Sequence, residues 1–258
     1  MTTHSAISTS TRKQRPVMKI TFASPSGGST PPAPSPAAAG PATVTAAAPP
    51  RHGRWWAICG ALAGLLGLVQ FALVGGLGIE TSDLADNELL AEAVSDKAPF
   101  VWGYQVIAVA TAMLIAVFAA GIFRKLSQQA PAQSLAPMVA VGGLFLVSAM
   151  LLVGSGICTE MFFGLIRDTD ELDADTVAAQ LAIFNTIGWV WVGAGLAAGA
   201  VALTGLRHGT VGRGVAIGSA VATALIAGVN VAPVQYMALV PGALWMLGTG
   251  ISFARRDQ

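Results

Sequence analysis

From Trp55 onward the chain consists of long apolar runs separated by short polar breaks. Each run approaches the ~20 residues that an α-helix needs to cross a hydrocarbon core. Because backbone groups in lipid must be satisfied within the segment itself, the pattern predicts an all-α, polytopic membrane helix bundle over residues 54–256. The six expected transmembrane helices are residues 55–79, 99–123, 137–160, 180–205, 212–231 and 234–253.

The division between the last two spans depends on the segment Asn230-Val231-Ala232-Pro233. Pro233 cannot continue the helical hydrogen-bond ladder and disfavours helix at Ala232, so we expect a tight hairpin at this point. The alternative is one bent helix followed by a re-entrant piece. That arrangement would have five spans, and it would place the C-terminus on the other side of the membrane.

The distribution of cations decides between these alternatives, because Lys and Arg near span ends are retained on the cytoplasmic side. A five-span arrangement would leave Arg255 and Arg256 outside, so we expect six spans with both termini in the cytoplasm. The opposite face would hold Lys97 and Arg167 among the acidic stretches 80–96 and 168–175. In the six-span arrangement eight cations share the cytoplasmic face: Arg51, Arg54, Arg124, Lys125, Arg207, Arg213, Arg255 and Arg256.

Residues 1–53 are rich in Pro, Ala, Ser and Thr, and they predict a disordered cytoplasmic tail, since such a stretch buries too little apolar surface to offset its ordering entropy. The first long apolar run begins only at Trp55, too far along the chain for a secretory signal. Residues 17–22 alternate as a short strand does, although a solvated run is the favoured interpretation and a docking motif the alternative. The tail is therefore a candidate contact for a membrane or cytoplasmic protein partner.

Composition narrows the function further. The chain is 54% hydrophobic and 10% charged, and its net charge of +1 comes from scattered basic residues, which excludes nucleic acid as a partner. His4, His52 and His208 lie in the tail or in a link between spans, so no pair of histidines can hold a haem or a metal within the bilayer. Cys59 and Cys158 fall near opposite ends of their spans, too far apart for a disulfide. We expect no catalytic residue, no cofactor and no metal, and therefore no enzyme.

Glu160 is the one ionisable residue within a long apolar run, and an acid in that position is a candidate proton relay or cation ligand. Counted from Pro137, however, it lies about 34 Å along its helix, near the outer edge of a hydrocarbon core of about 30 Å. The favoured interpretation is an interfacial carboxylate that reaches water or pairs with Arg167, seven residues further on.

Uncharged polar residues within the spans include Gln70, Gln105, Asn185, Asn230 and Gln235. In hydrocarbon such side chains commonly hydrogen-bond across a helix interface. Gln105 and Asn185 lie toward the outer half, as Glu160 does, and the three form a candidate outward-facing polar site.

Three pairs of glycines recur at the spacing that lets helices approach closely: Gly60 with Gly64, Gly195 with Gly199, and Gly214 with Gly218. They predict tight packing within the chain. The segment Gly209-Thr210-Val211-Gly212-Arg213-Gly214 lacks the Lys-Ser/Thr of a Walker loop and follows no strand, so we do not interpret it as a loop of that type. Pro241 should kink the last span, and the six tryptophans are expected to be interfacial anchors.

The Ala/Gly/Val-rich spans, and the stretch from Thr204 through Gly214 into Val215-Ala216-Ile217-Gly218, resemble small six-helix bacterial membrane proteins of unknown function that are common in actinobacteria. The resemblance covers residues 55–256, and the long N-terminal tail is not typical of that group. It implies a plasma-membrane location, and no functional motif carries over.

Two functions remain. The first is a non-enzymatic accessory or scaffold component, whose helices pack against partners in the bilayer. The second is a small transporter or channel that uses Glu160 with Gln105 and Asn185, in which the two sets of three helices form an inverted pair.

Overall fold

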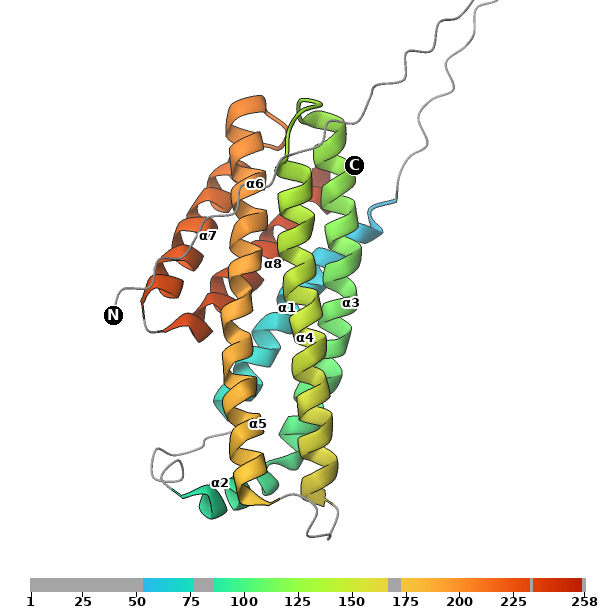
Figure 1. The fold of residues 1–258 in the computed structure, drawn as a ribbon. Helices are drawn as coiled ribbons and strands as arrows, with labels where there is room; N and C mark the ends of the chain where they lie inside the picture. The colour runs from blue at the N-terminus through green and yellow to red at the C-terminus, as the bar shows by residue number, and fades with distance from the viewer. Residues whose placement is uncertain (1–52, 77–85, 167–172, 233, 257–258) are drawn as a thin grey trace, which may run out of the picture. The chain divides into compact units, whose positions relative to one another are not determined.

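The computed structural model describes residues 53–76, 86–166, 173–232 and 234–256 (Figure 1). The expected tail, except Gly53, lies outside the described residues, as do the 17–22 segment and Arg167. Within the described ranges the elements are helical and there is no strand. In chain order they are α1 (Trp55–Gly76), α2 (Asn87–Ser95), α3 (Ala98–Gln129), α4 (Ala136–Ile166), α5 (Ala174–Thr186), the 3₁₀ helix η2 (Ile187–Trp191), α6 (Val192–His208), α7 (Arg213–Val231), the 3₁₀ helix η3 (Gln235–Ala238) and α8 (Leu239–Arg256).

Six stretches are long and apolar enough to cross a bilayer, which confirms the expected number and order of spans. The fourth is the continuous run α5–η2–α6, Ala174–His208. The hairpin between the fifth and sixth spans is also confirmed, since α7 ends at Val231 and Val234 N–H donates to Ala232 O at 2.8 Å. Pro233 itself lies outside the described residues.

Large apolar side chains cover the outside of these helices. Five that are 45% exposed or more, from five different helices, are Leu65, Met113, Phe145, Leu196 and Leu225. A water-soluble protein does not expose so much contiguous apolar surface. Together with the six spans, this surface defines an integral membrane protein that contacts the lipid bilayer.

Each long helix of the bundle packs mainly against one or two neighbouring helices. α3 packs against α1 and α4, α4 against α6, α6 against α7, and α1 against α8 (Figure 1). The consecutive pair α7 and α8 touches only sparsely, because α8 turns away to pack along α1. This divergence leaves the space described below as the candidate site.

Glycine allows the closest of these approaches. A Cβ at Gly64 would overlap the backbone of Ala243 and Leu247 on α8, and one at Gly60 would overlap the Phe118 ring. Gly195 likewise packs against Ile226, and Gly199 lies in ordinary contact range of Thr223. These two predicted glycine pairs are confirmed. The prediction for Gly214 and Gly218 was wrong, because a Cβ at either position would meet no atom of the chain within 4 Å.

Three tryptophans belong to the core rather than to the membrane interface. Trp56 stacks on Phe118 with 6.0 Å between ring centroids, and Trp191 and Trp245 are also buried. The expectation of interfacial anchors therefore fails for these three. Burying a large ring against glycine-lined helices contributes more contact area than any aliphatic side chain would.

Several helices continue beyond the expected spans at the end of the bundle that we call the acidic end, which carries Asp86, Glu88, Glu92, Asp96, Asp173 and Asp175. α4 has 31 residues and continues to Ile166, six residues past the expected end of its span at 160, and at 1.5 Å per residue it is about 46 Å long, well over a hydrocarbon core of ~30 Å. α2 lies where a loop was expected, and its Leu90 and Val94 pack with Tyr104, Met161 and Phe184 of α3, α4 and α5 in a second apolar core. The Asn87 Nδ2 group donates to Asp175 Oδ1 at 2.7 Å and ties α2 to α5.

Pro241 is the third residue of α8, preceded by η3. The first-turn N–H groups of a helix have no partner within the helix, so a proline here removes little. The irregularity that we expected as a kink within a long helix is thus a short 3₁₀ turn before the α-helix begins.

Candidate functional site

The largest described cavity lies between α7 and α8. It has a volume of about 790 Å³, within the range of ligand pockets. Its length follows α7 from Gly214 to Val229, which at 1.5 Å per residue is about 22 Å. We call it the α7–α8 groove. It is lined by Phe71, Gly214, Val215, Gly218, Ser219, Val221, Ala222, Leu225, Val229, Met237, Val240, Pro241, Leu244, Trp245, Gly248, Thr249 and Ser252.

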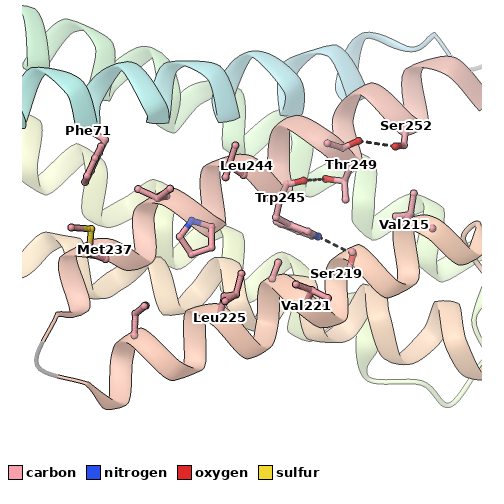
Figure 2. Close-up of a pocket in the computed structure, with 17 residues that line it drawn as sticks. Phe71, Val215, Ser219, Val221, Leu225, Met237, Leu244, Trp245, Thr249 and Ser252 are labelled. Atoms are coloured by element: carbon pink, nitrogen blue, oxygen red, sulfur yellow. Dashed lines mark hydrogen bonds between the residues drawn. The ribbon is translucent and has the colours of Figure 1, made fainter.

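The walls of the groove are apolar, and its few polar groups already have partners (Figure 2). The Trp245 indole Nε1–H donates to Ser219 Oγ at 2.9 Å, across from α8 to α7. The Thr249 hydroxyl donates to the Trp245 carbonyl at 2.6 Å, and the Ser252 hydroxyl to the Gly248 carbonyl at 2.7 Å. No lining residue is ionisable. The groove is therefore suited to holding an apolar molecule and not to acid–base chemistry.

Glycines keep the groove open. Gly214 and Gly218 on α7 and Gly248 on α8 all line it, and a Cβ added at any of the three would meet nothing within 4 Å. The hydrophobic side chains Val221, Leu225 and Leu244 are each 52–54% exposed along its edges. The groove thus opens sideways, on the surface that the bundle presents to lipid.

The three residues of the predicted polar site lie in the part of the bundle near the acidic end, and none of them is joined to another by a described hydrogen bond. Glu160 and Asn185 are exposed, and Gln105 is half-buried. Glu160 Oε2 accepts from Gln180 Nε2 at 3.3 Å, a partner on α5 that sequence reasoning missed because both the start and the register of that helix were unknown.

Helix contacts show the depth of Glu160. Gly154 on α4 packs against Ile187, and the neighbouring Gly188 packs against Tyr236 in the turn between α7 and α8. Glu160 is six residues beyond Gly154, which is about 9 Å further toward the acidic end. α7 itself spans about 28 Å, close to the thickness of a hydrocarbon core. The position of Glu160 along α4 therefore agrees with that of a carboxylate at the membrane interface.

A buried polar pair links α1 to α3. The Gln70 Nε2 group donates to Thr111 Oγ1 at 2.7 Å, and the Thr111 hydroxyl donates to the Ile107 carbonyl at 2.7 Å. The expected role of Gln70 as an interhelical contact is confirmed. Asn230, in contrast, bonds within its own helix, to the Ile226 carbonyl at 2.8 Å.

No family model, curated protein or solved structure matches the chain. The fold and the candidate site define an integral membrane protein built as a six-span helix bundle with a lateral apolar groove.

Proposed function

We propose that this protein is a non-enzymatic accessory component of a bacterial plasma membrane, and that it holds a membrane-embedded molecule in the α7–α8 groove. The observation that carries the proposal is the direction in which the α7–α8 groove opens. It opens between two diverging helices on the lipid-facing side, and its lining is apolar. A cavity that conducts solute would instead need a polar path between the two ends of the bundle.

The glycines support this role. In lipid there is no hydrophobic gain from burying an apolar surface, so association depends on close van der Waals packing. Gly214, Gly218 and Gly248 leave backbone accessible to an incoming chain or helix, since no neighbour within the protein fills the space beside them. Gly64 and Gly195, in contrast, are already covered by neighbouring helices.

Site-specific photocrosslinking tests the proposal. Leu225, on the edge of the groove, and Leu196, on α6, are 54% and 51% exposed. They lie at the same depth, because Gly195 packs against Ile226. With p-benzoylphenylalanine at position 225 we expect a discrete adduct after irradiation of cells, which Gly218→Leu suppresses by filling the groove. The matched probe at position 196 should give no such adduct, and identical patterns at both positions would overturn the proposal.

A second candidate function is a small transporter or channel with its site at Glu160, Gln105 and Asn185. The contact of Glu160 with Gln180, and the buried Gln105 Oε1 that has no described partner, favour it. Glu160→Gln in proteoliposomes separates the two functions. A loss of ion- or proton-coupled flux with normal folding would support transport, whereas unchanged behaviour would remove this site.

A further inference from the structure

A smaller cavity lies at the other end of the bundle from the acidic end. We call this the arginine-rich end, because Arg54, Arg124, Arg207, Arg213 and Arg255 lie at the helix ends that meet there. The cavity has a volume of about 260 Å³. It is lined by Lys125 of α3, Gly209, Thr210, Val211 and Gly212 of the α6–α7 link, and Phe253 of α8.

Thr210 is the first sign that this cavity accepts a ligand. The side chain is only 5% exposed, and its Oγ1 has no hydrogen-bond partner among the described residues. A buried hydroxyl without a partner costs about 1–3 kcal/mol, so such groups are rare in native structures. A ligand oxygen in the cavity would supply the missing acceptor.

The start of α7 is the second sign. This 19-residue helix begins after Gly212, and no side chain caps its first turn. The N–H groups of a first turn have no acceptor within the helix, and the helix dipole adds a partial positive charge there. Gly212 itself lines the cavity. Uncapped helix starts of this kind bind phosphate groups through their backbone N–H groups.

The positive charge at the cavity is the third sign that it accepts a ligand. The Lys125 Nζ atom lies 5.0 Å from the centre of the Phe253 ring, which places an ammonium group at the cavity. Arg213, the first residue of α7, is exposed beside it.

Gly209 sets the backbone conformation of the α6–α7 link. Gly209 ends α6 with φ 66°, the left-handed conformation that favours glycine, and its N–H donates to the Gly205 carbonyl at 3.1 Å. The chain therefore reverses within a few residues and returns Thr210 to Gly212 between the two helices. The result differs from a Walker loop, since no strand precedes it and the lysine comes from another helix.

We propose that this cavity binds a phosphate group, through the Thr210 hydroxyl, the first-turn N–H groups of α7 and the Lys125 ammonium. The site goes beyond the proposed function of the groove. A free phosphate and the phosphate of a lipid headgroup share the chemistry that it recognises. A change of lipid distinguishes the two sources.

The test measures thermal unfolding of the full chain in detergent with inorganic phosphate, against chloride at equal ionic strength. Phosphate should raise the Tm of the natural protein. Thr210→Val should raise the Tm without phosphate, because it removes an unpartnered hydroxyl, and should weaken phosphate binding at least tenfold. Thr210→Ser, which keeps the hydroxyl, should restore binding, and Lys125→Gln should weaken it at least tenfold.

The matched control is Thr204→Val, since Thr204 is also buried but its hydroxyl bonds the Ala200 carbonyl at 2.8 Å. It should leave the phosphate effect unchanged. Two results would overturn the proposal. One is that phosphate stabilises the natural protein no more than chloride does. The other is that phosphate stabilises the Thr210→Val variant as much as it stabilises the natural protein.

Nanodiscs identify the source of the phosphate. If a lipid headgroup occupies the cavity, nanodiscs of phosphatidic acid should raise the apparent Kd for inorganic phosphate relative to nanodiscs of a phosphate-free anionic lipid at the same surface charge. If free phosphate is the ligand, both lipids should give the same Kd. The groove crosslinks at position 225 are independent of these results, so either proposal can fail alone.

Discussion

Trp245 on α8 donates its indole N–H to the hydroxyl oxygen of Ser219 on α7, over 2.9 Å. Both residues are buried and both line the α7–α8 groove. Among the described residues no other side-chain hydrogen bond joins these two helices. Because α7 and α8 otherwise touch sparsely, this bond fixes the floor of the groove and the distance between its walls.

A double-mutant cycle measures that bond. Trp245→Phe should destabilise the folded bundle, with about 1 kcal/mol of the loss shared with Ser219→Ala, since interhelical hydrogen bonds in lipid contribute roughly that much. Unfolding by a denaturing detergent gives the four free energies. Trp245→Phe combined with Thr204→Val is the control and should be additive. Additive losses for Trp245 and Ser219 as well would show that the bond contributes nothing.

Gly64 and Gly218 form a matched pair of substitution sites. Gly64→Ala should destabilise the bundle by about 1–3 kcal/mol, because the new methyl group would overlap the backbone of α8 at Ala243 and Leu247. Gly218→Ala faces open space and should be neutral or slightly stabilising, since alanine favours helix over glycine by up to about 1 kcal/mol. Equal losses at the two sites, measured by thermal unfolding in detergent, would mean that another surface covers Gly218.

The Gln70–Thr111 hydrogen bond predicts that substitutions of its two residues lower the free energy of unfolding by unequal amounts. Thr111→Val should cost about 1–3 kcal/mol, because it leaves the buried Gln70 amide without its acceptor, and Gln70 Oε1 already lacks a described partner. Gln70→Leu should cost much less, since the Thr111 hydroxyl keeps its bond to the Ile107 carbonyl. Free energies of unfolding for the two variants give the comparison, and a larger loss for Gln70→Leu would contradict the assignment.

Asp173 predicts a pH dependence at the start of α5. Its carboxylate accepts from the Thr176 N–H at 2.7 Å, and this bond holds the pKa of Asp173 below its ordinary value. A carboxyl with a lowered pKa stabilises the folded form fully above its unfolded pKa of about 3.9, and that stabilisation is lost as the pH falls through the lower folded value.

Amide hydrogen exchange in the first turn of α5 measures this effect. Protection factors there should fall in acid in the natural protein. Asp173→Asn keeps an N-cap acceptor that does not titrate, so its protection should stay constant over the same range. A parallel decline in the Asn variant would show that the acid effect arises elsewhere.

The number and order of the spans could be predicted from sequence because lipid imposes a strict length on apolar helices. Several of the helix ends could not be predicted. α3 continues past the expected end of its span at 123 to Gln129, and α5 begins at Ala174, six residues before the expected start of its span at 180. Beyond the hydrocarbon core, a helix ends by capping and tertiary contacts, such as the Asp173 cap, and hydropathy carries no signal for these.

The groove could not be predicted, because the glycine pattern is the same whether or not a neighbour is present. Gly60 with Gly64 meets other helices, while Gly214 with Gly218 faces open space. Whether a glycine pair contacts another helix or faces open space depends on the direction of α8, which packs along α1. The Glu160–Gln180 contact was hidden for the same reason, since it needs the register of two helices against each other.

The account depends most on the groove facing hydrocarbon and not water. A spin label at Leu225→Cys, with Cys59→Ser and Cys158→Ala, reports this directly through its collisions with oxygen and with a water-soluble nickel chelate. The same label at Leu196→Cys is the lipid-facing reference at equal depth, and at Leu135→Cys, where the natural side chain is 75% exposed beside the α3–α4 link, it is the aqueous reference. We predict that position 225 excludes the nickel chelate as position 196 does; collision rates as high as those at position 135 would contradict the account.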